Sequence, residues 1–255
     1  MTPPRLSRAT RFAILLRLFA VQGSWNYETM LGNGIAFAIA PALRRLPGGR
    51  KGAAYKAAIA RESGWFNAHP YLAAIAVGAL ARAELDGEPP ERIERFRSAL
   101  AGPLGSVGDQ LVWAGWLPFC SVLALLAFGL GASPLAVVLL FLITYNAGHI
   151  ALCIWALEAG WRDGLRVAGA LGAPLLRRGP QRIAGAALVL GAFALPLAAA
   201  RVARTAFCPN AWWIAGFSAL ALLVWALLVR ARGRLAGWSL ASAALAALTV
   251  AAVAR

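Results

Sequence analysis

The stretch LVWAGWLPFCSVLALLAFGLGASPLAVVLLFLITYNAGHIALCIWAL, residues 111–157, decides the fold class because it contains no Asp, Glu, Lys or Arg. A helix needs about 20 apolar residues to cross the hydrocarbon core of a bilayer. Leu111–Leu130 and Leu135–Leu157 each meet that length, and the short turn Gly131–Pro134 separates them. The stretch therefore predicts two membrane-spanning helices.

The composition of the whole chain agrees with a membrane protein. Of its 255 residues, 60% are hydrophobic and 14% are charged, and the formal net charge is +15. A soluble domain carries about 25% charged residues, so this chain lacks the charge to cover a water-facing surface. Its basic residues are scattered, which argues against a nucleic-acid partner. In a membrane chain, arginine is more commonly used at cytoplasmic loops, where it sets orientation.

Three further apolar segments bring the expected number of spans to about five: Ile183–Ala200, Ala211–Val229 and Leu235–Ala254. The arginine-rich loops 158–182 and 230–234 are predicted to be cytoplasmic, because cytoplasmic loops carry an excess of Lys and Arg. We therefore expect a multi-pass protein of the cell inner (cytoplasmic) membrane. The region before Leu111 then lies on the cytoplasmic side, and the C-terminus faces outward.

The N-terminal region, residues 1–110, is organised differently from residues 111–255. Its apolar patches are short or interrupted by Arg, Gly or Pro: Phe12–Gln22, Leu31–Leu46 and Tyr71–Ala83. Such patches suit amphipathic helices at the membrane interface or re-entrant segments buried in protein. A charged cytoplasmic helix is expected near Asp86–Arg97. The predicted fold class is thus an all-α integral membrane protein, with an amphipathic or re-entrant region at 1–110 and a transmembrane region at 111–255.

Polar clusters interrupt the apolar sequence at four places. The first, QGSWNYETM at Gln22–Met30, combines the hydrogen-bonding groups of Gln22, Asn26 and Glu28 with the flat faces of Trp25 and Tyr27. Carbohydrate sites combine these two chemistries, because a sugar presents hydroxyls at its edges and C–H groups on its face. The same pattern also fits the start of an amphipathic helix that has no ligand.

The second and third clusters contain one titratable candidate each. WFNAHPY at Trp65–Tyr71 places His69 before a proline, which favours extended backbone. This histidine could accept a phosphoryl group, carry a proton or cap a helix. GPLGSVGDQLVW at Gly102–Trp113 places Asp109 at the membrane boundary. An aspartate there is a functional candidate, or it is the N-cap of the helix that follows.

The fourth cluster, YNAGH at Tyr145–His149, lies inside the second predicted span. Asn146 and His149 are three residues apart and share one helix face, where they could contact a substrate or form interhelical hydrogen bonds. No carboxylate or cysteine pattern stands at metal-ligand spacing. We therefore expect no metal site and no cofactor.

Taken in order, these clusters resemble the IID subunits of the mannose/fructose/sorbose-family phosphotransferase systems. The family has a Gln before WN[FY]E-R-M, and this chain has Gln22 and WNYETM; the family then has P-x-[LI] after a Gly-rich segment, and this chain has GIAFAIAPAL. The family's FFNTHP corresponds to WFNAHPY, and its MGPLAG[IV]GDSLFW corresponds to LAGPLGSVGDQLVW. The later N-x-x-H of the family corresponds to YNAGH. The chain departs from this pattern at three places. Thr29 stands where the family usually has Arg, Gln110 where it has Ser, and Arg61–Glu62 where a His precedes FFN.

The resemblance implies a membrane subunit that pairs with a IIC subunit to translocate a hexose-type sugar. Soluble IIA and IIB components then relay phosphate, and the IIB component phosphorylates the sugar. It implies a hetero-oligomer in which this chain is non-catalytic and carries no phosphorylated residue. The departures leave an alternative, a transport-deficient membrane regulator or scaffold of the same family. The residues expected on the substrate path or at the subunit interface are Gln22, Trp25, Asn26, Glu28, Asn67, His69, Asp109, Asn146 and His149.

Overall fold

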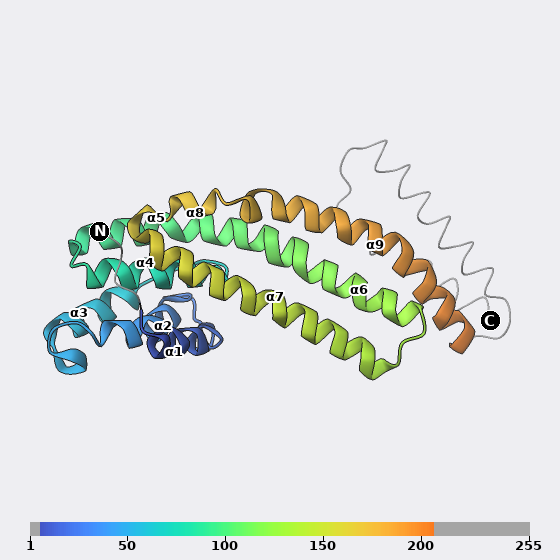
Figure 1. Ribbon diagram of the computed structural model, residues 1–255, viewed down its shortest axis with the longest axis horizontal. Coiled ribbons are helices and arrows are strands. Elements are labelled where there is room, and N and C mark those ends of the chain that lie inside the picture. The colour runs from blue at the N-terminus through green and yellow to red at the C-terminus, as the bar shows by residue number, and fades with distance from the viewer. Residues whose placement is uncertain (1–5, 207–255) are drawn as a thin grey trace. The chain divides into compact units, whose positions relative to one another are not determined.

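The computed structural model describes residues 6–206, and all regular elements in this part of the chain are helices (Figure 1). The all-α class predicted from the sequence is therefore confirmed for the described residues. The elements in chain order are α1 (Arg8–Leu18), α2 (Gly32–Leu43), η1 (Gly49–Lys51), α3 (Ala53–Glu62), α4 (Ala73–Leu85), α5 (Pro90–Gly108), η2 (Asp109–Trp116), α6 (Leu117–Gly129), α7 (Pro134–Asp163), η3 (Gly164–Arg166), α8 (Ala168–Leu171) and α9 (Pro174–Ala206).

Three helical stretches are long and apolar enough to cross a membrane: Pro90–Gly129, Pro134–Arg166 and Pro174–Val202. Apart from Leu130, they contain the first three predicted spans, which are confirmed as helices. The total of about five spans is not confirmed, because Ala211–Val229 and Leu235–Ala254 lie outside the described residues.

The first of these stretches begins at Pro90 rather than at Leu111, because α5, η2 and α6 form one continuous helix. The charged segment that was expected to be a separate helix is the N-terminal end of α5. The η2 segment is a π-helix, in which the Leu117 N–H donates to the carbonyl of Val112, five residues back. A proline follows at Pro118, whose ring crowds the carbonyl four residues back. The wider π-helical turn before it allows the helix to continue.

The described residues form two compact units, one of residues 6–120 and 141–187, and one of residues 121–140 and 188–206. The first unit contains every candidate site residue. The predicted division between 1–110 and 111–255 concerns position relative to the bilayer, and it stays a prediction.

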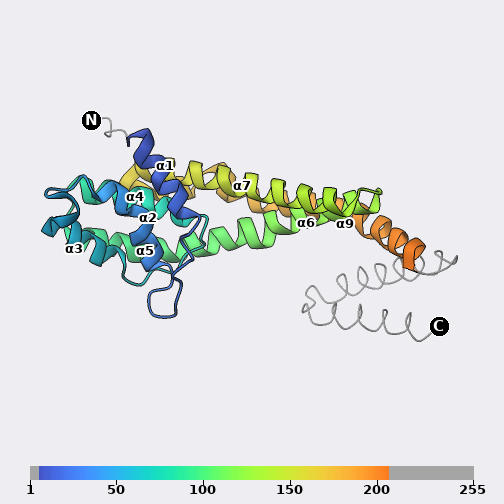
Figure 2. The same ribbon diagram turned by 90° about the horizontal axis from the view of Figure 1, so that it is seen from below.

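The short helices α1 to α4 build the core of the first unit. Contacts join α1 to α2, α2 to α3 and α4, and α4 to α5, and Figures 1 and 2 show these helices gathered in one cluster. Helix α4 is buried without interruption from Ala73 to Ala81. A helix that is apolar on every face packs inside protein. This burial suits a segment that is too short to span a membrane alone and that is enclosed by its neighbours.

Replacing Gly160 by alanine is expected to push α4 away from α7 and to destabilise the first unit. A Cβ at Gly160 would lie 2.1 Å from the Ile75 carbonyl oxygen, and one at Gly78 would lie 2.5 Å from the Leu157 carbonyl oxygen. Small residues at such crossings let membrane helices approach closely, and overpacking costs about 1–3 kcal/mol. We expect Gly160→Ala to lower the thermal midpoint of the purified protein.

The matched control for this packing is Gly185→Ala in α9. A Cβ added at Gly185 meets no atom within 4 Å, so this variant is expected to unfold at the wild-type midpoint. Equal midpoints for Gly160→Ala and Gly185→Ala would contradict the close crossing of α4 and α7.

In the second unit, the C-terminal end of α6 packs against α9. A Cβ at Gly129 would lie 2.7 Å from the Leu197 Cβ, so glycine permits this approach. The Arg201 guanidinium donates to the carbonyls of Phe128 and Ala132 and lies 4.4 Å from the centre of the Phe128 ring. These bonds add a charged donor to one carbonyl in the last turn of α6 and one in the loop that follows.

Candidate functional site

A cavity of about 400 Å³ opens in the first unit where two loops meet the junction of α5 and η2. We refer to it as the polar cavity. It brings together five of the nine residues selected from the sequence: Gln22, Trp25, Asn67, His69 and Asp109. Its other lining residues are Leu31, Ala68, Pro70, Gly102, Gly105, Ser106 and Trp113.

Two backbone hydrogen bonds hold the two loops together. The Leu31 N–H donates to the Phe66 carbonyl at 3.0 Å, and the Phe66 N–H donates to the Thr29 carbonyl at 3.1 Å. Met30, between them, has a φ of 52°, which is uncommon for a residue other than glycine. These bonds place the loop after α1 beside the loop after α3, so that Gln22 and Trp25 line the same cavity as Asn67 and His69.

Asn26 shapes the first loop instead of lining the cavity. Its Oδ1 accepts from the backbone N–H groups of Glu28 and Thr29, both at 2.9 Å, and its Nδ2 donates to the Thr29 Oγ1. An asparagine that bonds its own backbone in this way fixes a turn. The Glu28 side chain is exposed and does not line the cavity. The structure thus separates Asn26 and Glu28 from the other residues of their cluster.

His69 presents one nitrogen without a partner. Its Nδ1 accepts from the Tyr71 N–H at 3.2 Å, which assigns the proton to Nε2. The Nε2 atom is buried and has no hydrogen-bond partner among the described residues. Burial lowers the pKa of His69 to about 4, and the charge of His149 contributes in the same direction. The side chain is therefore a neutral N–H donor at physiological pH.

Close packing fixes the position of this imidazole. A Cβ at Gly108 would lie 2.1 Å from the His69 Cβ, so glycine lets α5 approach the histidine. The ring also contacts Trp113, with 5.1 Å between the ring centres. Trp113 was not selected from the sequence. Its spacing of four residues from Asp109, which puts both on one helix face, was the available signal.

Asp109 lies at the first residue of the π-helix, inside continuous helix. Its N–H bonds to the carbonyls of Gly105 and Ser106, so the alternative that it is an N-cap is wrong. Its side chain is exposed and lines the polar cavity. Single π-helical turns inside α-helices are frequent at functional sites, and here the turn begins at the carboxylate that faces the cavity.

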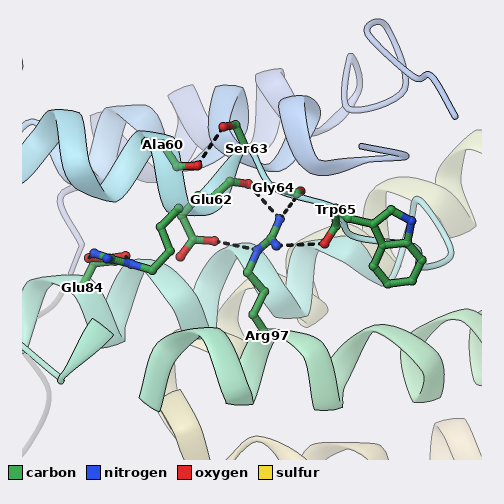
Figure 3. Close-up of polar contacts among 8 residues, drawn as sticks. Ala60, Glu62, Ser63, Gly64, Trp65, Glu84 and Arg97 are labelled. Atoms are coloured by element: carbon green, nitrogen blue, oxygen red, sulfur yellow. Dashed lines mark hydrogen bonds and ion pairs between the residues drawn. The ribbon is translucent and has the colours of Figure 1, made fainter. Parts of the chain in front are cut away.

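A buried arginine braces the loop that carries Asn67 and His69 (Figure 3). Arg97 of α5 donates to the carbonyls of Glu62, Gly64 and Trp65 at 3.0, 2.6 and 2.9 Å. Its Nε lies 3.3 Å from the Glu62 carboxylate, and its guanidinium carbon lies 5.2 Å from the centre of the Phe66 ring. These contacts hold the end of α3 and the following loop against α5.

The Arg61–Glu62 departure from the family pattern belongs to the same buried cluster. Arg61 donates to both carboxylate oxygens of Glu84 at 2.8 and 3.0 Å. Burial raises the pKa of the Glu62 carboxyl to about 8, against the opposing attraction of Arg97. Sequence reasoning missed Arg97 and Glu84. The signal for Arg97 was its place on the apolar stripe of α5, with Ile93 four residues before it and Leu104 seven residues after it.

Asn146 and His149 lie apart from the polar cavity. Asn146 is exposed, and its Nδ2 donates to the Leu142 carbonyl of its own helix at 2.7 Å. His149 stacks on Tyr71, with 3.5 Å between ring centres and 11° between ring planes, and it lines a second cavity. Within residues 6–206, no group of three or more His, Cys, Asp or Glu side chains could hold a metal ion.

Comparison with known proteins points to one family. The sequence profile described as "PTS system mannose/fructose/sorbose family IID component" matches residues 5–208. The mannose-specific EIID component of Escherichia coli (strain K12) is 32% identical over 201 residues, which cover 76% of this chain and 68% of that protein. The fructose permease IID component of Bacillus subtilis (strain 168) is 29% identical over 197 residues, which cover 75% and 68%.

A solved structure shows the same fold. A chain in the cryo-EM structure of the mannose transporter ManYZ in complex with microcin E492 superposes with a TM-score of 0.58 and 28% sequence identity. The superposition covers 73% of this chain and 69% of that chain.

Proposed function

The chain belongs to the mannose/fructose/sorbose-family IID components, membrane subunits of sugar phosphotransferase transporters, and from this premise we propose that its polar cavity lies on the sugar path. The sugar is of the hexose type and is phosphorylated by a IIB component after or during its passage. The chain acts as a multi-pass subunit of the cytoplasmic membrane.

The observation that carries this proposal is a buried donor and an acceptor in one cavity. The His69 Nε2–H has no partner among the described residues, and the Asp109 carboxylate lines the same cavity. A buried polar atom without a partner costs about 1–3 kcal/mol. Because Nε2 is buried, a ligand hydroxyl recovers that cost once a neighbouring side chain has moved aside. A second hydroxyl can donate to Asp109.

The aromatic side chains of the polar cavity provide the apolar contacts that carbohydrate recognition requires. Trp25 and Trp113 line the cavity, and both are about half exposed, at 47% and 45%. A sugar ring that packs its C–H groups on these indoles leaves its hydroxyls to Gln22 and Asn67, whose side-chain amides both donate and accept. The arrangement supports binding of an uncharged polyhydroxyl compound.

The partners follow from the family. The similar chain was solved within the mannose transporter ManYZ, and we propose that this chain forms a hetero-oligomer with a IIC subunit. Soluble IIA and IIB components then deliver the phosphoryl group. His69 is 1% exposed, which hinders any approach by a phosphocarrier protein. We therefore propose a non-catalytic role for this chain.

The regulatory or scaffold alternative is not favoured, because the matching proteins are IID components and because two of the three departures that motivated it make structural contacts. The Thr29 hydroxyl is bonded to Asn26 in the first loop. Arg61 and Glu62 form ion pairs with Glu84 and Arg97. Each of these residues stabilises the walls of the polar cavity and leaves the cavity itself open.

The proposal is tested in membrane vesicles from cells that lack their own mannose-family IID component. The vesicles contain the IIC partner encoded in the same genome as this chain, with IIA, IIB and phosphoenolpyruvate supplied. We expect sugar phosphorylation only when the chain is present, and we expect IIC to co-purify with it. Full activity without the chain, or purification of the chain as a stable lone monomer, would contradict the proposal.

A further inference from the structure

The second cavity of the first unit is apolar and lies between helices that can cross a membrane. It has a volume of about 360 Å³, and the side chains that line it include Leu111, Trp116, Leu152, Trp155, Leu175 and Ile183. They come from η2, α7 and α9, whose stretches each meet the length and hydropathy of a span. We refer to it as the apolar cavity.

The polar groups beside the apolar cavity are already bonded or stacked. The Tyr71 hydroxyl is hydrogen-bonded to the Tyr145 hydroxyl at 2.8 Å, and the Tyr71 ring is stacked on His149. The Trp116 Nε1–H donates to the Tyr145 carbonyl at 3.3 Å. A sugar would lose hydrogen bonds in such a cavity. An acyl chain would lose none, and ligand pockets span about 300–1,000 Å³, so the volume suits a segment of one chain.

Two arginines border the apolar cavity on the surface of α9. At 100° per residue, Arg182 lies about 20° and Arg178 about 60° around the helix from Leu175, on the side away from Ile183, so both flank the edge of the cavity that Leu175 lines. Both side chains are exposed, and no carboxylate among the described residues pairs with either. They stand in the first turns of a spanning helix that begins at Pro174, where lipid headgroups are expected.

We propose that this chain binds an anionic phospholipid, with one acyl chain in the apolar cavity and the phosphate on Arg178 and Arg182. Arginine forms strong, bidentate hydrogen bonds with phosphate, and basic pockets between membrane helices on the cytoplasmic side bind anionic headgroups. Loop 158–182 was predicted to be cytoplasmic from its arginines, so the lipid belongs to the inner leaflet. The inference requires a membrane location but no role of the polar cavity in sugar transport.

The test is native mass spectrometry of the purified complex, with phosphatidylglycerol or phosphatidylcholine of identical acyl chains added. We expect the wild type to retain phosphatidylglycerol preferentially. Two arginines near an anionic headgroup contribute about fivefold each. The double variant Arg178→Gln/Arg182→Gln should therefore lower that retention about twenty-five-fold. Ala151→Phe, which fills the apolar cavity, should lower the retention of both lipids.

The matched control is Arg177→Gln. Arg177 is exposed on the same turn but lies about 160° around the helix from Leu175, so this variant should bind phosphatidylglycerol as the wild type does. Equal retention of the two lipids by the wild type would overturn the proposal. Unchanged phosphatidylglycerol binding by the double variant would also overturn the proposal. Loss of the IIC subunit without loss of lipid would also overturn it, because the arginines would then belong to a protein interface.

Discussion

Replacing Asp109 by asparagine is expected to lower the rate of sugar uptake by about ten- to a hundredfold, with the subunit still present in the membrane. A charge-assisted hydrogen bond contributes about 1.5–3 kcal/mol, and 1.4 kcal/mol corresponds to a tenfold change. Asparagine keeps the shape of the side chain and removes its charge. Because Asp109 lies inside continuous helix, the substitution deletes no helix cap and should leave folding intact.

The control for this loss is Glu94→Gln, which neutralises an exposed carboxylate of α5 outside the polar cavity. Uptake and phosphorylation of the sugar are measured for both variants at matched membrane levels of this chain and its IIC partner. Wild-type uptake by Asp109→Asn at normal levels would exclude the carboxylate from the sugar path. Lost expression together with lost uptake would instead make Asp109 a structural residue.

Replacing Arg97 by methionine is expected to destabilise the subunit by about 3–5 kcal/mol, the cost of removing one partner of a buried ion pair. Arg97 is 7% exposed and Glu62 is fully buried. The variant leaves the Glu62 carboxylate and three loop carbonyls without their donor. We expect a sharp fall in the membrane level of the chain and in the thermal midpoint of the purified complex.

Two further variants separate charge from packing at this position. Arg95→Met, two residues before Arg97 in α5, removes an exposed guanidinium whose one hydrogen bond among the described residues is to the Glu91 carbonyl of its own helix. This variant should behave as the wild type. Adding Glu62→Gln to Arg97→Met should restore little of the loss, because burial raises the pKa of the Glu62 carboxyl to about 8 and keeps it mostly protonated once Arg97 is gone. Equal stability of Arg97→Met and Arg95→Met would show that the buried cluster does not brace the loop.

The membrane spans were predictable because an uncharged apolar stretch of about 20 residues is stable as a helix across the hydrocarbon core of a bilayer. Leu111–Leu130 and Leu135–Leu157 lie inside the observed helices except for Leu130, which follows the end of α6. The upstream boundary was not predictable, because charged residues in the first turns of α5 resemble a separate helix until the continuous backbone is seen. The burial of α4 from Ala73 to Ala81 follows from its apolar faces, but the close crossing of α4 and α7 depends on Gly78 and Gly160, and no local pattern encodes that pairing.

The sequence identified most of the polar residues that line the polar cavity, but it could not show which of the selected residues lie outside it. Polar side chains in apolar sequence pointed to Gln22, Asn67, His69 and Asp109, and the structure gathers them. The sequence could not decide whether an amide bonds a ligand or its own backbone. In the structure, the side-chain amides of Asn26 and Asn146 both bond to backbone groups. Arg97 was hidden because an arginine in a charged segment is usually solvated, and only its carbonyl partners across the fold explain its burial.

The most direct test of the sugar path is protection of a cysteine inside the polar cavity. Ser106 lines that cavity, and Ser98 is exposed on the same helix outside it. Each is replaced by cysteine in a chain whose Cys120, Cys153 and Cys208 are changed to alanine, and labelling by a thiol reagent is followed in membranes that contain the IIC partner. Saturating transported sugar is predicted to slow labelling of Ser106→Cys and to leave Ser98→Cys unchanged. Labelling of Ser106→Cys at one rate with and without sugar would contradict the account.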